Sequence, residues 1–125
     1  MKRVLVVDDS ATFRQLLCMG LSRLESINQA NITEATDGED ALKKLQDGHF
    51  DLVLTDIRMP KLDGLEFVRQ VRDGLGNHEL PIIIISTKGE ETDIELGMSI
   101  GASGYLSKPI SISRLKDVVI SYLGE

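Results

Sequence analysis

The sequence predicts an α/β fold in which five parallel strands form a doubly wound (βα)5 sheet. Short apolar runs alternate along the whole chain with segments whose apolar residues recur every three or four positions. The run of four isoleucines at 82–85 is typical of a central parallel strand, which is buried on both faces. A chain of 125 residues has the size of one domain, so a single domain over 1–125 is expected.

Five strands are expected in chain order, at about 3–7, 31–35, 52–56, 81–86 and 104–107. The first, third and fourth are continuous apolar runs, whereas the second has the weakest pattern of the five. The third ends at Asp56, and the fifth ends at Ser107, immediately before Lys108-Pro109.

Each of the five intervening helices is expected to bury one apolar stripe against the sheet. The second is short and ends at Asp47-Gly48. The third cannot begin before about Leu62 because of Pro60, and the fourth covers about 91–100. The stripes are Phe13, Leu16, Leu17, Gly20, Leu21 and Leu24; Ala41, Leu42 and Leu45; Leu65, Val68, Val71 and Arg72; Ile94, Gly97 and Met98; and Ile112, Leu115, Val119 and Leu123.

The composition restricts the class of function. An apolar content of 42% with 27% charged residues is ordinary for a soluble globular domain. The net charge of −6 repels a phosphate backbone, so no direct nucleic-acid partner is expected. The single cysteine, Cys18, excludes an internal disulfide and is expected to be a packed thiol. Because no membrane span or signal peptide is recognisable, a cytoplasmic protein without a membrane partner is expected.

Charged side chains follow three of the predicted strands. Asp8 and Asp9 follow the first, Asp56 closes the third, and Lys108 follows the fifth. Because the carboxyl ends of parallel strands converge on one crevice, we expect these groups to meet there. Crowded carboxylates raise one another's pKa unless a cation binds, and Mg2+ favours a few carboxylates together with water and phosphate oxygens. The pattern predicts a site for a divalent cation and a phosphoryl group, although Asp8-Asp9 alone also fits a solvated turn that caps the next helix.

A hydroxyl and an amine complete the predicted site. Ser86, at the end of the fourth strand, can donate to a phosphoryl oxygen, and Lys108 can neutralise the same group. A shift of one residue would put Thr87 in the place of Ser86, so either can be the hydroxyl of the site. Taken singly, a strand-end serine and a surface lysine are ordinary features.

These motifs together resemble the receiver domain of two-component response regulators, of the stand-alone, CheY-like type with a flavodoxin-like fold. The matching segments are Asp8-Asp9, the run from Asp56 to Gly64, Ser86, and the run from Gly104 to Pro109. They cover the whole chain in the right order. The competing families lack a required residue, since a haloacid-dehalogenase-like phosphatase needs a second aspartate where Arg58 stands, and no P-loop or dinucleotide-binding glycine motif is present.

The resemblance implies a set of roles. Asp56 would accept a phosphoryl group from the phosphohistidine of a sensor histidine kinase. Asp8, Asp9, Asp56 and the backbone carbonyl of Arg58 would surround Mg2+. Ser86 and Lys108 would contact the phosphoryl oxygens, and the bond from Lys108 to Pro109 would be cis. On phosphorylation, Ser86 or Thr87 would move toward the phosphoryl group and Tyr105 would turn inward.

The resemblance also implies how the signal leaves the domain. The output face would be formed by the helix at 91–100, the strand at 104–107 and the last helix, with Leu96, Tyr105, Ser107 and Lys116 as candidates. The expected function is a single receiver domain with no attached output domain that binds a downstream target, chemotaxis being one such pathway. The alternatives are a phosphorelay intermediate that passes the group to a histidine phosphotransfer protein, or a fragment of a larger regulator. A monomer is expected, with a dimer on phosphorylation left open, and catalysis is confined to the protein's own phosphorylation and dephosphorylation.

Two basic side chains are candidates for setting the lifetime of the phosphorylated form. Arg58 and Lys88 each lie two residues beyond a site residue, at the rim where water must approach an acyl phosphate. Our hypothesis is that their long side chains hinder that water and slow self-dephosphorylation. Two solvated basic side chains without such a role fit the sequence equally well.

Overall fold

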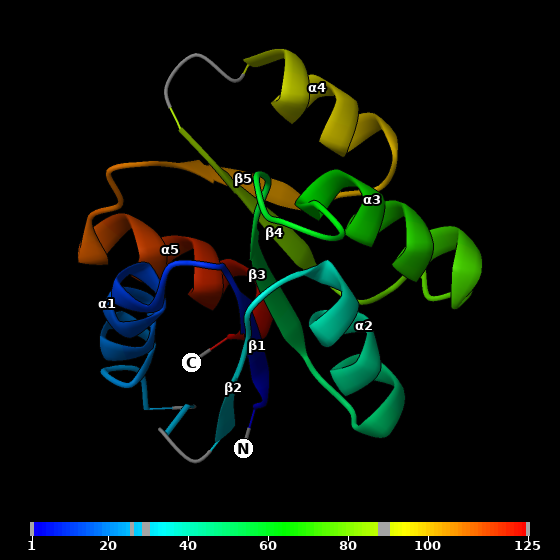
Figure 1. Ribbon diagram of the computed structural model, residues 1–125. Helices are drawn as coiled ribbons and strands as arrows, with labels where there is room; N and C mark the ends of the chain where they lie inside the picture. The colour runs from blue at the N-terminus through cyan, green and yellow to red at the C-terminus, as the bar shows by residue number, and fades with distance from the viewer. Residues whose placement is uncertain (1, 26, 29–30, 88–90, 125) are drawn as a thin grey trace.

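The structure is a computed structural model that describes residues 2–25, 27–28, 31–87 and 91–124. It confirms the predicted fold class: five parallel strands form one sheet in the order β2-β1-β3-β4-β5 (Figure 1). The strands are β1 (Val4–Val7), β2 (Ile32–Ala35), β3 (Leu52–Asp56), β4 (Ile82–Ser86) and β5 (Gly104–Ser107). Each lies within a residue of its predicted bounds.

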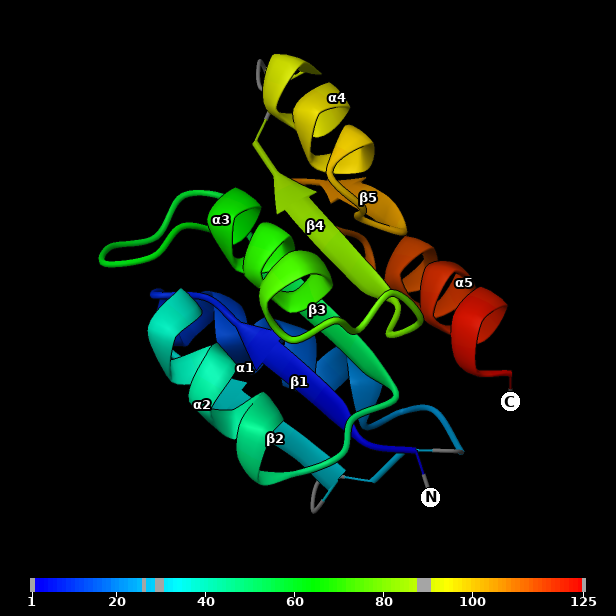
Figure 2. The same cartoon turned by 90° about the vertical axis from the view of Figure 1, so that its right-hand side faces the viewer.

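Helices cover both faces of the sheet. They are α1 (Ala11–Leu21), α2 (Gly38–Asp47), α3 (Gly64–Arg69), a short π-helical segment η2 (Gln70–Gly74), α4 (Glu91–Ser99) and α5 (Ile112–Leu123). Helices α1 and α5 lie on one face, and α2, α3 and α4 lie on the other (Figures 1 and 2). Along β1, Val4 and Val6 join the core under α1 and α5, whereas Leu5 and Val7 join the opposite core, because successive strand residues point to opposite faces. No helix among the described residues is long and apolar enough to cross a membrane.

The third predicted helix is wrong in its form. It is not one α-helix, because the chain widens at Gln70 into η2 and remains so until Gly74. The segment buries Arg72, whose guanidinium donates to the carbonyl oxygens of Gly101 at 2.9 Å and Asn77 at 3.1 Å. Arg72 thus does lie on the inner side, as its stripe predicts, but it is held there by hydrogen bonds that tie η2 to the segment before β5.

Two members of the predicted apolar stripes are exposed. Leu16 on α1 is 37% exposed, and Met98 on α4 is 39% exposed. Helix α4 approaches the sheet through Gly97, where an added Cβ would lie 2.6 Å from the Cδ1 of Ile84. Gly97 is thus the buried residue of this helix, and the adjacent Met98 faces outward. Leu24 is buried as predicted but lies beyond the end of α1.

The loop after β3 folds back tightly on the strand it has left. The N–H of Gly64 donates to the carbonyl of Ile57 at 2.8 Å. A Cβ on Gly64 would lie 2.1 Å from the backbone oxygen of Asp56, so only glycine fits at this position. This contact fixes the backbone around Asp56 at the carboxyl edge of the sheet.

Candidate functional site

The carboxyl edge of the sheet brings together charged groups from three strand ends. Asp8 follows β1, Asp56 ends β3, and Lys108 follows β5. The Nζ atom of Lys108 lies 3.6 Å from the Oδ2 of Asp56 and 3.7 Å from the Oδ2 of Asp8. Both carboxylates are buried, with Asp8 1% and Asp56 7% exposed. The convergence that the sequence predicted for these residues is therefore present.

Asp9 completes a cluster of three acids. Asp8, Asp9 and Asp56 each offer an oxygen atom, and these atoms all lie within 4.8 Å of one another. Asp8 and Asp56 are buried, whereas Asp9 is exposed at the rim. Three carboxylates at this spacing, one of them exposed, form a cluster that could hold a small cation.

The acidic pair does not itself cap the helix that follows. The N-cap of α1 is Ser10, whose hydroxyl accepts from the N–H of Phe13 at 3.2 Å. Asp8 instead accepts the N–H of Ser10 through Oδ1 at 2.8 Å. Its other oxygen, Oδ2, is buried and has no hydrogen-bond partner among the described residues. Asp8 thus orients the cap, while its Oδ2 faces Lys108 at 3.7 Å without a hydrogen bond.

The electrostatics of the two buried carboxylates differ from those of an ordinary aspartate. Burial raises the pKa of Asp56, and the nearby charge of Asp8 raises it further, against the opposing effect of Lys108. Burial also raises the pKa of Asp8, although the N–H of Ser10 and the charge of Lys108 lower it in part. A cation bound nearby would therefore stabilise the ionised form of both carboxylates.

Two of the candidate switch residues, Ser86 and Tyr105, lie on the neighbouring strands β4 and β5, and Tyr105 pairs in register with Ile84. Ser86 is fully buried at the end of β4, and its hydroxyl has no hydrogen-bond partner among the residues described. It pairs in register with Ser107, and its carbonyl accepts the N–H of Lys108 at 2.7 Å. Thr87 is exposed, and the side chain of Tyr105 lies outward, with the residue 46% exposed. The peptide bond between Lys108 and Pro109 is cis, as the sequence resemblance implies.

One of the two candidate lifetime residues, Arg58, lies two residues beyond Asp56 and is exposed. The guanidinium of Arg58, 71% exposed, forms an ion pair with Asp93 of α4. This pair joins the loop after β3 to the helix after β4. Lys88 lies outside the described residues.

Sequence reasoning missed two partners of the site. The ring of Phe13 lies under the ammonium of Lys108, with 4.1 Å from Nζ to the ring centroid. The guanidinium of Arg14 donates to the backbone carbonyl of Asp8 at 2.7 Å. Their position in the first turn after Asp8-Asp9 was the available clue, because that turn must start at the same edge of the sheet.

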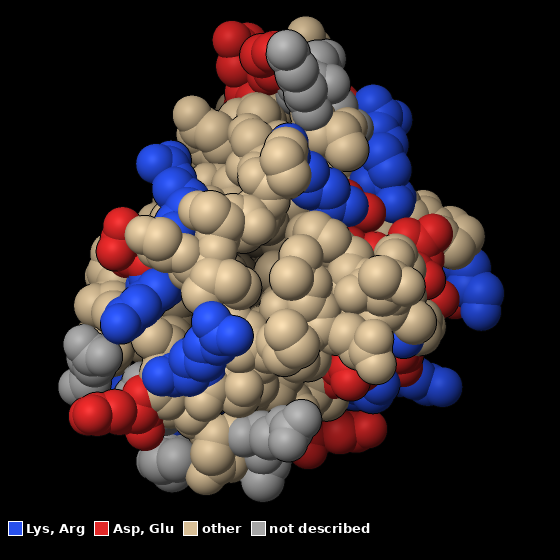
Figure 3. Space-filling model, turned by 90° about the vertical axis from the view of Figure 1, so that its left-hand side faces the viewer, with Lys and Arg blue, Asp and Glu red and all other residues tan. Residues whose placement is uncertain are grey.

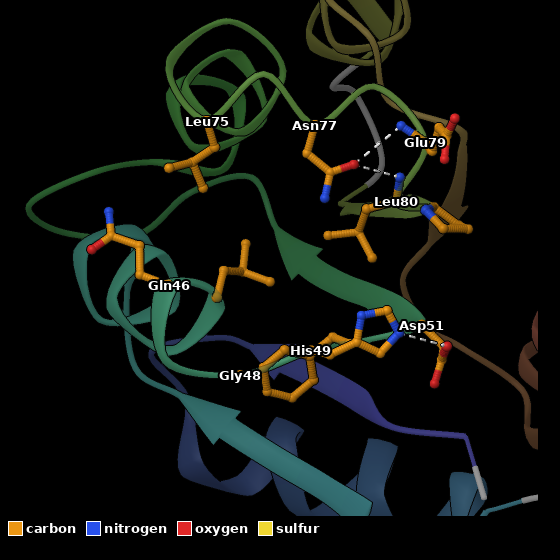
Figure 4. Close-up of a pocket in the computed structure, with 11 residues that line it drawn as sticks. Gln46, Gly48, His49, Asp51, Leu75, Asn77, Glu79 and Leu80 are labelled. Atoms are coloured by element: carbon orange, nitrogen blue, oxygen red, sulfur yellow. Dashed lines mark hydrogen bonds and ion pairs between the residues drawn. The ribbon is translucent and has the colours of Figure 1, made fainter.

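A hollow lies at the opposite, amino-terminal end of the strands. It has a volume of about 440 Å3 and is lined by the segments that lead into β3 and β4, with His49, Asp51, Leu75 and Asn77 around it (Figure 4). Two of its polar side chains already have partners, since Asn77 Oδ1 accepts the N–H of Glu79 at 3.1 Å and His49 pairs with Asp51 at 3.2 Å. The volume of this hollow is therefore no reason to prefer it over the acidic cluster as the functional site.

The charges on the surface do not form a binding track for a polyanion on the face shown in Figure 3. Lysine and arginine side chains are scattered there among neutral surface and acidic groups. Together with a net charge of −6, this distribution gives no support for direct binding of nucleic acid.

Comparison with known proteins gives a consistent result. Residues 4–120 match the family described as the response regulator receiver domain. The chain is 39% identical over 110 residues to the alkaline phosphatase synthesis transcriptional regulatory protein PhoP of Bacillus subtilis, covering 88% of this chain and 43% of that protein. It is 33% identical over 122 residues to the probable chemotaxis protein CheY of Rhizobium etli, covering 98% of this chain and 92% of that protein.

A solved structure shows the same likeness. The chemotaxis response regulator CheY4 of Vibrio cholerae superposes with a TM-score of 0.84 at 33% identity, over 98% of this chain and 99% of that chain. The present chain thus spans nearly all of the chemotaxis relatives but less than half of the length of PhoP, at 43%.

Proposed function

The chain belongs to the response regulator receiver family of two-component systems, and from that premise we propose that it accepts a phosphoryl group from a sensor histidine kinase onto Asp56. The observation that supports this best is the arrangement of Lys108 between the buried carboxylates of Asp56 and Asp8, at 3.6 and 3.7 Å. A nucleophilic carboxylate beside a fixed cation is what transfer of an anionic group requires.

The acidic cluster fits Mg2+. The three carboxylates lie within 4.8 Å of one another, and the buried Oδ2 of Asp8 has no hydrogen-bond partner among the described residues. The pKa values of Asp8 and Asp56 are both raised, so a cation would relieve their repulsion. Asp8, Asp9, Asp56 and the backbone carbonyl of Arg58 would hold the ion. When bound, it would neutralise the charge that accumulates on the oxygens of the transferred group.

The protein's own residues then carry the transfer. A carboxylate oxygen of Asp56 attacks phosphorus, an O–P bond forms, and the P–N bond to the donor histidine breaks with its electron pair left on the imidazole. Lys108 neutralises one phosphoryl oxygen, and the buried hydroxyl of Ser86 donates to another. Ser86 would have to move to do so, and the outward Tyr105 on the neighbouring strand would turn into the space behind it, while the exposed Thr87 stays the alternative hydroxyl.

The output follows from the exposed part of the same half of the molecule. Leu96 of α4 is 45% exposed and Tyr105 of β5 is 46% exposed. We propose that these residues, with Ser107 and Lys116, form the target-binding face across α4, β5 and α5. The function favoured is that of a cytoplasmic signalling domain of the chemotaxis type, because the chemotaxis relatives match this chain at 33% identity over nearly their whole length. A phosphorelay intermediate and the receiver part of a longer regulator are the alternatives, the second favoured by the partial coverage of PhoP.

The test is the intact mass of the protein after incubation with Mg2+ and acetyl phosphate. Wild-type protein should gain one phosphoryl group, and Asp56→Asn, as well as wild type with EDTA, should gain none. Asp51→Asn is the matched control, since Asp51 immediately precedes the opposite end of β3. A folded wild-type protein that gains no mass with either acetyl phosphate or a phosphorylated kinase would contradict the proposal.

A further inference from the structure

The ammonium group of Lys108 has a third neighbour besides the two carboxylates. Its Nζ lies 4.1 Å from the centroid of the Phe13 ring, on the ring face. We propose that Phe13 is a positioning residue for Lys108, whose aromatic face holds the ammonium beside Asp56 until a phosphoryl oxygen arrives. This inference rests on the proposed phosphoryl transfer to Asp56 and adds a residue that acts through Lys108.

The carboxylates alone do not fix the ammonium. The distances from Nζ to Asp56 and Asp8, 3.6 and 3.7 Å, are longer than a charge-assisted hydrogen bond, which measures about 2.7–2.9 Å. The face of an aromatic ring carries partial negative charge and attracts a cation within about 6 Å. Phe13 therefore supplies the close contact on the side of the ammonium that faces α1.

A neutral ring suits this position better than another acid would. Three carboxylates already lie within 4.8 Å of one another. A fourth negative charge would repel the phosphoryl group that Lys108 is to receive. The ring attracts the ammonium without adding net charge, and a cation–π contact has no fixed hydrogen-bond direction, so Lys108 can turn toward a phosphoryl oxygen without breaking a short ion pair.

The backbone holds the ring in place. The N–H of Phe13 donates to the hydroxyl of Ser10 at 3.2 Å, and the N–H of Ser10 donates to Asp8 at 2.8 Å. Phe13 also packs against the apolar core beneath α1 and α5. The turn that carries the metal-site aspartate is thus the turn that presents the ring to the lysine.

The chain contains a second pair of the same kind that serves as a control. The guanidinium of Arg3 lies 4.6 Å from the centroid of the Phe50 ring at the amino edge of the sheet. Phe50→Leu removes an aromatic face far from the site, whereas Phe13→Leu removes the one beside Lys108. Phe13→Tyr retains a ring face and should retain the effect.

Two readouts test the inference. Without any phosphodonor, the Lys108 ε-methylene protons should be shifted upfield by the ring in wild type and in Phe13→Tyr, and should move downfield in Phe13→Leu. With Mg2+ and acetyl phosphate, Phe13→Leu should gain its phosphoryl group about threefold to tenfold more slowly than wild type. Phe50→Leu should keep the wild-type rate. Phenylalanines with increasing fluorine content at position 13 should slow the reaction step by step, because fluorine weakens the ring face while nearly preserving its shape.

The failures of the two proposals are distinguishable. If wild type takes no phosphoryl group, the proposed function fails, while the lysine shift still decides whether the ring positions Lys108. If wild type is phosphorylated but the shift is absent, or fluorination leaves the rate unchanged, the role of Phe13 is overturned and the function stands.

Discussion

The two ends of strand β3 carry aspartates in opposite electrostatic states. Asp51, just before the strand, has its pKa lowered, first by the backbone N–H of Arg3 at 2.8 Å and then by His49. Asp56, at the other end, has its pKa raised by burial and by the charge of Asp8. The two residues are five positions apart. The fold stabilises the ionised form of Asp51, whereas it disfavours the ionised form of Asp56.

The same contrast holds for the two edges of the sheet. At the amino edge, the buried Arg72 has three oxygen acceptors, from Gly101, Asn77 and Ser103. At the carboxyl edge, the Oδ2 of Asp8 and the hydroxyl of Ser86 are buried without hydrogen-bond partners among the described residues. Buried polar groups normally cost stability when unpaired. We infer that the amino edge holds the fold together and that the carboxyl edge is completed by ligands.

The largest change in stability is expected from removing the hydrogen bonds of Arg72 at the amino edge of the sheet. Arg72→Ala should lower the free energy of unfolding by about 3 kcal/mol, because it removes a buried side chain and the donors of several hydrogen bonds. Urea denaturation measures this loss. The folded fraction should still accept a phosphoryl group in the intact-mass assay, and a variant of unchanged stability would refute the assignment of this edge to stability.

Neutralising Asp56 and neutralising Asp51 are expected to change the free energy of unfolding in opposite directions. Asp56→Asn should raise the free energy of unfolding at pH 7 by about 1 kcal/mol, because it removes a charge from a crowded, buried cluster. Asp51→Asn should lower it by about 1 kcal/mol, because Asp51 accepts the Arg3 N–H and pairs with His49. Parallel thermal and urea unfolding of the two variants gives the comparison, which fails if both substitutions change stability in the same direction.

The pH dependence of these differences should also be opposite. A raised pKa means that the folded state binds the proton more tightly than the unfolded state does. The stability advantage of Asp56→Asn should therefore be absent in acid and appear as the pH rises from about 4, the ordinary aspartate value, through the raised pKa. For Asp51 the lowered pKa reverses the sign, so its contribution is present above about 4 and is lost as the pH falls through the lower folded value. Unfolding curves of both variants at several pH values test this prediction, which is wrong if the two stability differences change in the same direction with pH.

The smallest effect is expected from Arg58, and it concerns the half-life of the phosphorylated protein. We propose that Arg58, paired with Asp93 across the loop and α4, hinders water from reaching an acyl phosphate on Asp56. Arg58→Asn should shorten the half-life of the phosphorylated protein by a few fold, a change of about 1 kcal/mol in the barrier. Decay of the phosphorylated mass after removal of acetyl phosphate measures it, with Arg69→Asn as an exposed arginine control. An unchanged or longer half-life would contradict the proposed role of Arg58. Lys88 carries the same proposal by its sequence position alone.

Much of the site could be predicted because a parallel sheet fixes where strand ends lie. The runs before Asp8, Asp56 and Lys108 identify three strands, and topology alone brings their carboxyl ends together. The separation of roles between Asp8 and Asp9 also follows from their adjacency, since one is buried and the other exposed.

The parts that escaped prediction depend on contacts between distant side chains. The ion pair between Arg58 and Asp93 spans 35 positions, and no local periodicity encodes it. Within the π-helical segment at Gln70–Gly74, Arg72 donates to the carbonyl of Gly101, 29 positions further along the chain, a contact that no local pattern encodes. Met98 was wrongly placed in a stripe because its neighbour Gly97 makes the helix contact narrow.

The most direct test of the central contrast is a measurement of the carboxyl titrations of Asp56 and Asp51 by NMR, with and without Mg2+. We predict that Asp56 titrates above the ordinary aspartate range without the ion and that its pKa falls when Mg2+ is added, while the pKa of Asp51 stays low in both conditions. An Asp56 that titrates at or below the ordinary value and does not respond to Mg2+ would contradict the claim that this edge is built to be completed by a ligand.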